Sequence, residues 1–195
     1  MPKYAPLDSR QAVLAYVHEQ LSAAVDDPAH GWHWPAMSTG HESRVVVLRA
    51  YRAVAGELLW YTDRRSDKVQ QLATDPTCGL LFYHAAHRTQ LRLQASVREV
   101  RDETVRRARW DGVGQSARAN YATAAAPGAP QPAATTDLPD GFPALDEAAV
   151  ARAYGNFAIY ACTYGRADFL QLLDVGAYRA RWSGCDGWGF TFVTP

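Results

Sequence analysis

Residues 90–98 read QLRLQASVR and alternate strictly between polar and apolar side chains. Leu91, Leu93, Ala95 and Val97 share one face, and polar residues fill the other. A period of two places successive side chains on opposite faces of a strand. This stretch therefore predicts a β-strand with one face in a hydrophobic core, and it is the clearest secondary-structure signal in the chain.

Three further apolar runs precede this strand and predict a sheet. Residues 43–49 (SRVVVLR) are a β-branched run between two arginines and predict a strand buried on both faces. Residues 57–62 (ELLWYT) predict the next strand, after a turn at residues 54–56, and residues 78–83 (CGLLFY) predict another. The central third of the chain is therefore predicted to be mainly β.

A short helix is predicted at residues 66–73, with Ser66 as its N-cap and Asp75-Pro76 as its stop signal. Lys68 lies in its first turn, where a cation opposes the helix dipole. An anion at that position would be bound by both the free N–H groups and the lysine. The pattern therefore favours a phosphate at the start of this helix.

The two arginines that bracket the first run have two interpretations. An apolar core strand gains nothing by itself from a cation at each end, so Arg44 and Arg49 indicate an anionic or polar ligand along it. Alternatively, both are solvated strand ends. The residues alone favour neither interpretation.

The rest of the chain is interpreted as packing and closure around this unit. An amphipathic helix is expected at residues 9–25, with Asp8 and Gln11 as a capping box. Residues 122–143 lack periodicity and predict a loop that is mobile or held only by contacts. The other expected elements are a first strand within residues 31–39, helices at 102–110, 115–121 and 146–154, strands at 156–164 and 167–173, and a closing hairpin over 178–195.

Composition bounds the class of protein. The chain has 195 residues, which suits one domain, and its 20 basic side chains balance 20 acidic ones. This balance excludes a net positive charge that would attract nucleic acid or an anionic membrane to the whole protein.

The sequence also favours a cytoplasmic protein. No apolar segment is long enough to act as a signal or to span a bilayer, and the three cysteines form no Cys-x-x-Cys pair. His84 and His87 lack a third ligand of suitable spacing, which argues against a metal site.

The ordered set of these motifs resembles the FMN-binding split barrel of the pyridoxamine-5'-phosphate oxidase family. The resemblance rests on Arg44 to Arg49, the pair Tyr61-Thr62, the Ser66-x-Lys68 segment before Asp75-Pro76, and Phe82-Tyr83 followed by residues 90–93. It implies an antiparallel split β-barrel with Greek-key character and flanking helices. It also implies an FMN cofactor, a homodimer with FMN at its interface, and a small-molecule substrate.

The resemblance implies roles for particular residues. Arg44 and Lys68 would hold the FMN phosphate, and other residues would lie along the cofactor: Val45, Leu48, Arg49, Tyr61, Thr62, Gln90 and Arg181. Ser116 and Arg118 would lie at the rim of the active site.

Several positions depart from the family pattern. Asp67 stands where the family commonly has arginine, and Arg64 or Arg65 is the nearby cation that would compensate. Arg49 replaces the usual lysine. The family's tryptophan near Gln171 and its Arg-x-His segment near residues 177–179, which would grip pyridoxal phosphate, are absent.

The function that the resemblance implies is that of an FMN-binding oxidoreductase acting on an unidentified small molecule. One alternative is a true pyridoxamine- or pyridoxine-5'-phosphate oxidase, which the altered tail disfavours. Another is a non-catalytic flavin-binding module.

Overall fold

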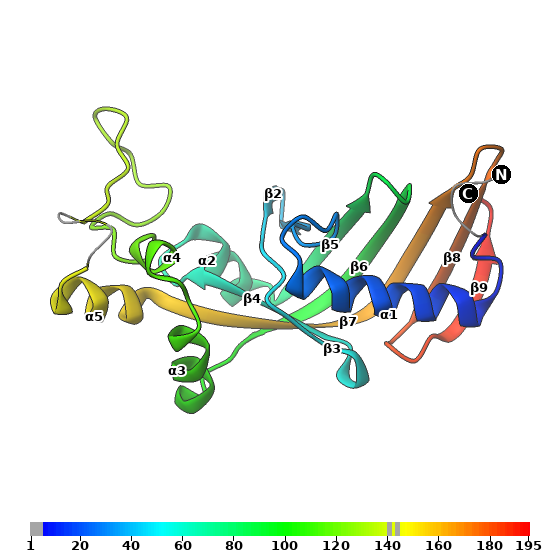
Figure 1. Cartoon of the computed structure of the whole chain (residues 1–195), viewed down its shortest axis with the longest axis horizontal. Coiled ribbons are helices and arrows are strands. Elements are labelled where there is room, and N and C mark those ends of the chain that lie inside the picture. Colours follow the sequence, from blue (N-terminus) through cyan, green and yellow to red (C-terminus); the bar gives the residue numbers. More distant parts are fainter. Residues whose placement is uncertain (1–5, 140–141, 143–144) are drawn as a thin grey trace. The chain divides into compact units, whose positions relative to one another are not determined.

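The structure is a computed structural model that describes residues 6–139, 142 and 145–195. The chain divides into two compact units (Figure 1). Unit 1 comprises the chain up to Trp60, Asp75–Arg98 and Ala161–Pro195, and unit 2 comprises Tyr61–Thr74 and Glu99–Tyr160. The expected single domain stays a prediction.

The described residues form one nine-stranded sheet, and seven of its strands follow the order β2-β1-β5-β6-β7-β4-β3. The other two strands branch from this path: β8 pairs with β7, and β9 pairs with β8. The sheet is mainly antiparallel and not closed, with helices beside it, and it is consistent with the predicted split barrel. Non-consecutive neighbours such as β1 and β5 give it the expected crossover connections. The strands are β1 (Ala36–Thr39), β2 (Glu42–Val45), β3 (Ala50–Arg52), β4 (Glu57–Asp63), β5 (Thr77–His84), β6 (Thr89–Glu99), β7 (Phe157–Leu172), β8 (Ala177–Ser183) and β9 (Trp188–Val193).

Strand β6 confirms the alternation on which the fold prediction rests. Leu91, Leu93, Ala95 and Val97 are buried, whereas the residues between them are exposed. Leu93 lies opposite Leu80 in the antiparallel register of β5 and β6. Alternate side chains of these two strands therefore supply part of the core of unit 1.

The prediction of one doubly buried strand at residues 43–49 is wrong. Strand β2 ends at Val45, whose side chain is 61% exposed, and β3 begins only at Ala50. Between them, the N–H groups of Val46 and Leu48 donate to the carbonyls of Pro35 and His33, whereas that of Arg49 donates to Leu59. The segment changes partners along its length, so it crosses from one strand to another and cannot form a single regular ladder.

Residues 156–173 also differ from the prediction, because the two expected strands are one. Strand β7 runs without a break through Gly165 and Arg166. Arg166 pairs with Ser183 of β8, and the Gly165 carbonyl accepts from the Gly184 N–H at 3.1 Å. Backbone pairing continues across the glycine, so its permissive conformation is not used as a turn here.

The predicted helices are present with shifted ends. Ser9, not Asp8, caps the first helix, because its side chain accepts from the Ala12 N–H. Asp102 and Asp146 cap α3 and α5 in the same way. The helices are α1 (Arg10–Asp26), the 3-10 turn η1 (Ala53–Ala55), α2 (Asp67–Thr74), α3 (Glu103–Asp111), α4 (Gln115–Ala119) and α5 (Glu147–Asn156). Among the described residues, none of these helices is both long and apolar enough to cross a lipid bilayer.

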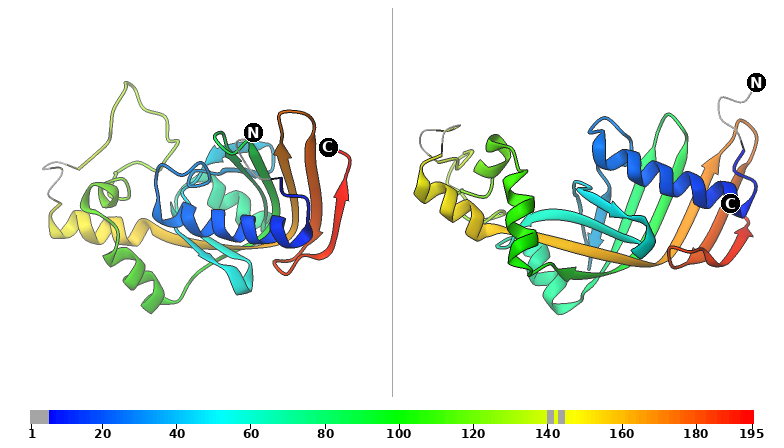
Figure 2. Two further views of the ribbon diagram at one scale, coloured as in Figure 1. Left: turned by 45° about the vertical axis from the view of Figure 1, so that its right-hand side comes forward. Right: turned by 60° about the horizontal axis from the view of Figure 1, so that its bottom comes forward.

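Helix α1 covers the sheet of unit 1, and Figure 2 shows it beside the strands. Its buried face carries Val13, Val17 and Leu21. Tyr16 packs edge-on against Phe169 of β7, with ring centroids 5.8 Å apart. The amphipathic pattern of this helix therefore closes the core as predicted.

Three histidines of unit 1 pack against one another where α1 and the β5–β6 hairpin meet. The rings of His84 and His87 stack at 3.8 Å, and His30 meets His84 edge-on at 4.9 Å. His30 Nδ1 accepts from the Trp32 N–H at 3.1 Å, and His84 Nδ1 accepts from the His87 N–H at 3.2 Å. Both acceptor nitrogens must stay unprotonated to keep these bonds.

Burial lowers the pKa of both His30 and His84. Asp27 raises the pKa of His30, whereas His87 and His33 lower it; His87 and His30 also lower the pKa of His84. The usual pKa of a histidine side chain is about 6.5, and the pKa values of His30 and His84 are lower than this in the folded protein. As pH falls below about 6.5, these two side chains therefore bind protons more readily in the unfolded chain than in the folded one.

We expect the free energy of unfolding to decrease as pH is lowered from about 8 to about 5. Urea unfolding followed by circular dichroism at a series of pH values measures the slope. The variant His84→Asn keeps an acceptor for the His87 N–H and should flatten this dependence, whereas the exposed His41→Asn should not. An identical slope in the wild type and in His84→Asn would contradict this account.

Candidate functional site

Three polar side chains of unit 2 converge at the start of α2, and we call this group the Lys68 cradle: Thr62, Ser66 and Lys68. Lys68 Nζ lies 3.2 Å from Thr62 Oγ1 and 3.3 Å from Ser66 Oγ. Thr62 and Ser66 are buried, and Lys68 is half-buried. The structure therefore brings Thr62, Ser66 and Lys68 together, and their role at a phosphate stays a prediction.

A tight turn between β4 and α2 positions this group. Asp63 Oδ1 accepts from the Arg65 N–H at 2.8 Å, which is the hydrogen bond of an Asx turn. The Asp63 carbonyl accepts from both the N–H and the hydroxyl of Ser66, at 3.1 and 2.7 Å. These bonds set the direction in which α2 begins and hold the Ser66 hydroxyl next to Lys68.

Arg64 and Arg65, the cations expected to compensate for Asp67, each form an ion pair with another carboxylate. Arg65 forms a bidentate pair with Asp63, with Nε–Oδ1 at 3.0 Å and Nη2–Oδ2 at 2.7 Å. The hydrogen bond to Asp63 raises the pKa of Arg65. Arg64 pairs with Glu99 at 3.4 Å and lies near the Phe157 carbonyl. Both side chains therefore already have partners, and compensation for Asp67 by either of them stays a prediction.

The predicted residues of unit 1 occupy varied environments. Arg44, in β2, donates to Thr39 Oγ1 and pairs with Glu42 at 2.7 Å. Leu48 is buried in the core, whereas Arg49 is exposed and its N–H donates to the Leu59 carbonyl. Arg44 is thus one step from the exposed Val45 along the same strand.

The two remaining central residues are half-buried. The Tyr61 ring, in unit 2, meets Phe157 edge-on at 5.0 Å. Gln90, in unit 1, lies opposite Tyr83 in the register of β5 and β6. Each of these two residues is therefore partly exposed to solvent.

Arg181 belongs to a cluster that the sequence did not reveal. The Asp168 carboxylate, whose side chain is 14% exposed, accepts from Arg92, Arg179 and Arg181 at 2.6 to 3.0 Å. Burial alone would raise the pKa of Asp168, but the hydrogen bonds from Arg179, Arg181 and Arg92 together hold it well below its usual range. The cluster borders a cavity of about 610 Å³ that Arg166 and Ser38 also line. An acidic residue inside the apolar run at 167–173 was the available signal.

Comparison with known proteins links the fold to a family. Residues 23–100 match the sequence model of the pyridoxamine 5'-phosphate oxidase FMN-binding domain. This match confirms the predicted resemblance across a range that holds every predicted cofactor residue except Arg181. No curated protein sequence matches the chain.

Solved structures agree on the fold. A pyridoxamine 5'-phosphate oxidase-related FMN-binding protein from Nostoc punctiforme is 19% identical, with a TM-score of 0.68 and 99% of each chain covered. PhzG from Burkholderia lata, solved in complex with tetrahydrophenazine-1-carboxylic acid, is 16% identical, with a TM-score of 0.71 and 98% of each chain covered. At these identities the likeness shows the split-barrel fold, which extends over nearly the whole chain.

The other residues that the family resemblance singled out are also placed. Arg118 Nη2 donates to the carbonyls of Trp110 and Asp111 at 2.9 and 3.1 Å, so it closes the end of α3. Ser116 lies exposed on α4. Within the described part of the chain, no group of three or more His, Cys, Asp or Glu side chains is arranged to hold a metal ion.

Proposed function

We propose that this protein binds FMN and acts as an oxidoreductase on a small molecule. The observation that carries the proposal is the Lys68 cradle, which lies inside the segment that matches the FMN-binding domain family. A cation and two hydroxyls at a helix start are groups that bind a phosphate monoester.

The residues of the cradle fit a phosphate in charge as well as in type. Lys68 supplies the positive charge, and Thr62 and Ser66 supply hydroxyls. Two carboxylates neighbour the cradle along the chain. That of Asp63 is already paired with Arg65, so its charge opposes the phosphate less, whereas that of Asp67 is exposed in the first turn of α2. The family resemblance also implies Arg44 as a cation for the phosphate; in unit 1 this side chain pairs with Glu42.

The remaining predicted residues would orient the rest of the cofactor. When bound, FMN supplies hydride and electron transfer through its ring system. Arg49, whose side chain is exposed, would place positive charge beside that ring and stabilise its reduced form. Val45, Tyr61, Gln90 and Arg181 would contact the ribityl chain or the ring, whereas the side chain of Leu48 is buried in the core.

The substrate of this enzyme is proposed to be anionic. Asp168 offsets one of the three arginines that contact it, so the cluster has a net positive charge beside the cavity. A negatively charged small molecule fits such a cavity. Gln171, Ala177 and Arg179 replace the family residues expected to grip pyridoxal phosphate, which disfavours a true pyridoxamine-5'-phosphate oxidase.

We also propose that the protein is a cytoplasmic homodimer. Large apolar side chains of unit 1 are exposed on β2, β5 and β9, and they would be covered in a dimer: Val45, Leu81, Tyr83 and Trp188. Light scattering of the purified protein should give twice the monomer mass of 21.5 kDa. A monomer mass in the presence of FMN would contradict the dimer.

Anaerobic spectroscopy of the FMN-loaded protein tests the proposed activity. We expect NADH or NADPH to bleach the visible absorption of the bound flavin, and air to restore it. Bound FMN that no nicotinamide nucleotide reduces would instead favour a non-catalytic flavin-binding module.

A further inference from the structure

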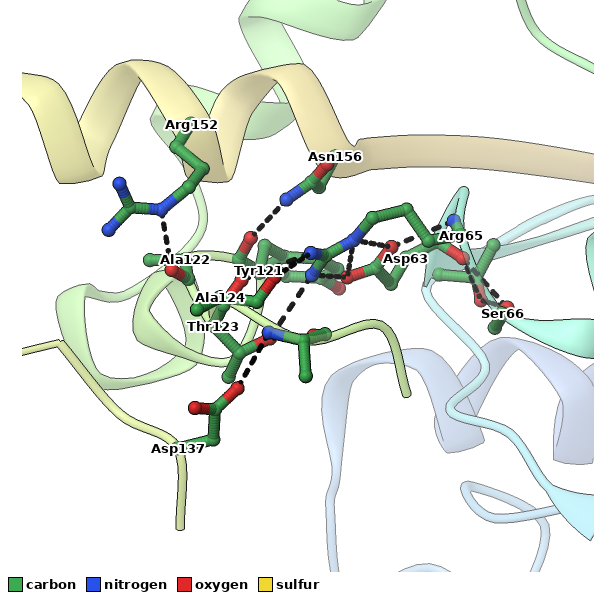
Figure 3. A network of polar contacts seen from close by, with 12 residues as sticks. Asp63, Arg65, Ser66, Tyr121, Ala122, Thr123, Ala124, Asp137, Arg152 and Asn156 are labelled. Atoms are coloured by element: carbon green, nitrogen blue, oxygen red, sulfur yellow. Dashed lines mark hydrogen bonds and ion pairs between the residues drawn. The ribbon is translucent and has the colours of Figure 1, made fainter. Parts of the chain in front are cut away.

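Arg65 links the turn of the Lys68 cradle to a distant loop of unit 2. Besides the Asp63 carboxylate, its guanidinium donates to the carbonyls of Thr123 and Ala124, at 3.0 and 3.3 Å, and to Thr123 Oγ1 at 3.1 Å (Figure 3). The Asp63 side chain is 6% exposed and that of Arg65 is 24% exposed. This is therefore a largely buried ion pair and not a solvated surface contact.

The loop that Arg65 contacts has few backbone partners of its own. Two side chains of α5 donate hydrogen bonds to backbone carbonyls of this loop. Asn156 Nδ2 donates to the Tyr121 carbonyl at 2.8 Å, and Arg152 Nε donates to the Ala122 carbonyl at 2.8 Å. The Ala125 N–H donates to Asp137 Oδ2 at 2.8 Å (Figure 3). In the described part of residues 122–143 there is no helix or strand, and positions 140, 141 and 143 lie outside the described residues. The sequence predicted a loop that is either mobile or held only by contacts. The start of this loop is held by side-chain contacts, which agrees with the second of these alternatives.

Asp63 gives the ion pair a consequence for ligand binding. Its carbonyl holds the Ser66 hydroxyl, and its carboxylate belongs to the same short turn as Thr62 and Lys68. Without Arg65, a nearly buried negative charge would remain next to the cradle. That charge would repel a phosphate and compete with it for Lys68.

We propose that Arg65 is a positioning residue for the cofactor phosphate: it neutralises Asp63 and fixes the cradle turn to residues 123 and 124. This inference rests on the proposed binding of FMN at the Lys68 cradle. It does not require Arg65 to touch the cofactor.

Binding of FMN and of riboflavin to the Arg65→Ala variant tests the proposal. Because riboflavin lacks the phosphate, quenching of flavin fluorescence should show at least about a tenfold loss of affinity for FMN and little change for riboflavin. The matched control Arg64→Ala removes a neighbouring arginine that pairs with Glu99, and it should bind both ligands as the wild type does. Equal affinity for FMN in the wild type and Arg65→Ala would overturn the proposal, as would an equal loss for both ligands.

Two further variants separate charge from folding. The double variant Asp63→Asn/Arg65→Ala removes both charges but keeps the side-chain oxygen that accepts from the residue 65 N–H, so it should recover most of the affinity for FMN. Arg65→Lys keeps a cation beside Asp63 and should stay within about threefold of the wild type even if Arg65→Ala does not fold. Failure of both variants to retain FMN affinity would overturn the charge argument. A wild-type protein that does not bind FMN would overturn the proposed function itself, and this inference with it.

Discussion

The Lys68→Ala variant is expected to lose about 2 kcal/mol or more of FMN binding free energy, which is roughly a 30-fold rise in Kd. Lys68 Nζ is the cationic donor of the cradle, within 3.3 Å of both hydroxyls. Its removal deletes a charge-assisted contact to phosphate, and the Ser66 hydroxyl does not replace it because that hydroxyl donates to the Asp63 carbonyl. Titration of the protein with FMN, followed by fluorescence quenching, measures the change.

The control for this experiment lies on the same helix. Gln70 is exposed on α2, two residues beyond Lys68, so Gln70→Ala should leave the Kd for FMN unchanged. Riboflavin should bind Lys68→Ala and the wild type alike. If Lys68→Ala kept the wild-type affinity for FMN, the phosphate would have to lie elsewhere.

The Phe157→Ala variant is expected to lower the free energy of unfolding by about 3–5 kcal/mol. Phe157 is fully buried in unit 2 and meets Tyr61, Trp110 and Tyr121 with ring centroids 5.0 to 5.3 Å apart. Its truncation removes the central ring and leaves a cavity that the large neighbouring rings cannot fill. Urea unfolding monitored by tryptophan fluorescence measures the loss.

A leucine on the same strand provides the comparison. Leu172, at the other end of β7, is 38% exposed, so Leu172→Ala should cost less than about 1 kcal/mol. Similar losses in the two variants would show that Phe157 does not have the central packing role described above.

Much of the fold could be predicted because its signals are local. The period-two pattern of β6 depends only on which side chains face a core, and burial confirms it at four alternating positions: Leu91, Leu93, Ala95 and Val97. Asp102 and Asp146 were the acidic residues at the starts of two predicted helices, and both cap them. Lys68 in the first turn of α2 was likewise visible from its spacing to Ser66.

What could not be predicted depends on contacts between distant segments. Residues 43–49 look like one strand, but their hydrogen bonds go to His33 and Pro35 and then to Leu59. Asp168 forms ion pairs with Arg92 of β6 and with two arginines of β8, and these two strands are far apart in sequence.

The partners of Arg65 were equally hidden. Its proximity to Lys68 suggested a phosphate ligand, yet the turn directs it to Asp63 and to the carbonyls of residues 123 and 124. A side chain two residues away and a loop nearly sixty residues further on decide its role, and neither follows from periodicity.

The central claim is that the Lys68 cradle binds the phosphate of FMN. The most direct measurement is a parallel titration of the purified wild-type protein with FMN and with riboflavin. If the cradle binds the phosphate through charge-assisted hydrogen bonds, FMN should bind at least about 30-fold more tightly than riboflavin. Equal affinities for the two flavins, or no binding of FMN at all, would contradict the claim.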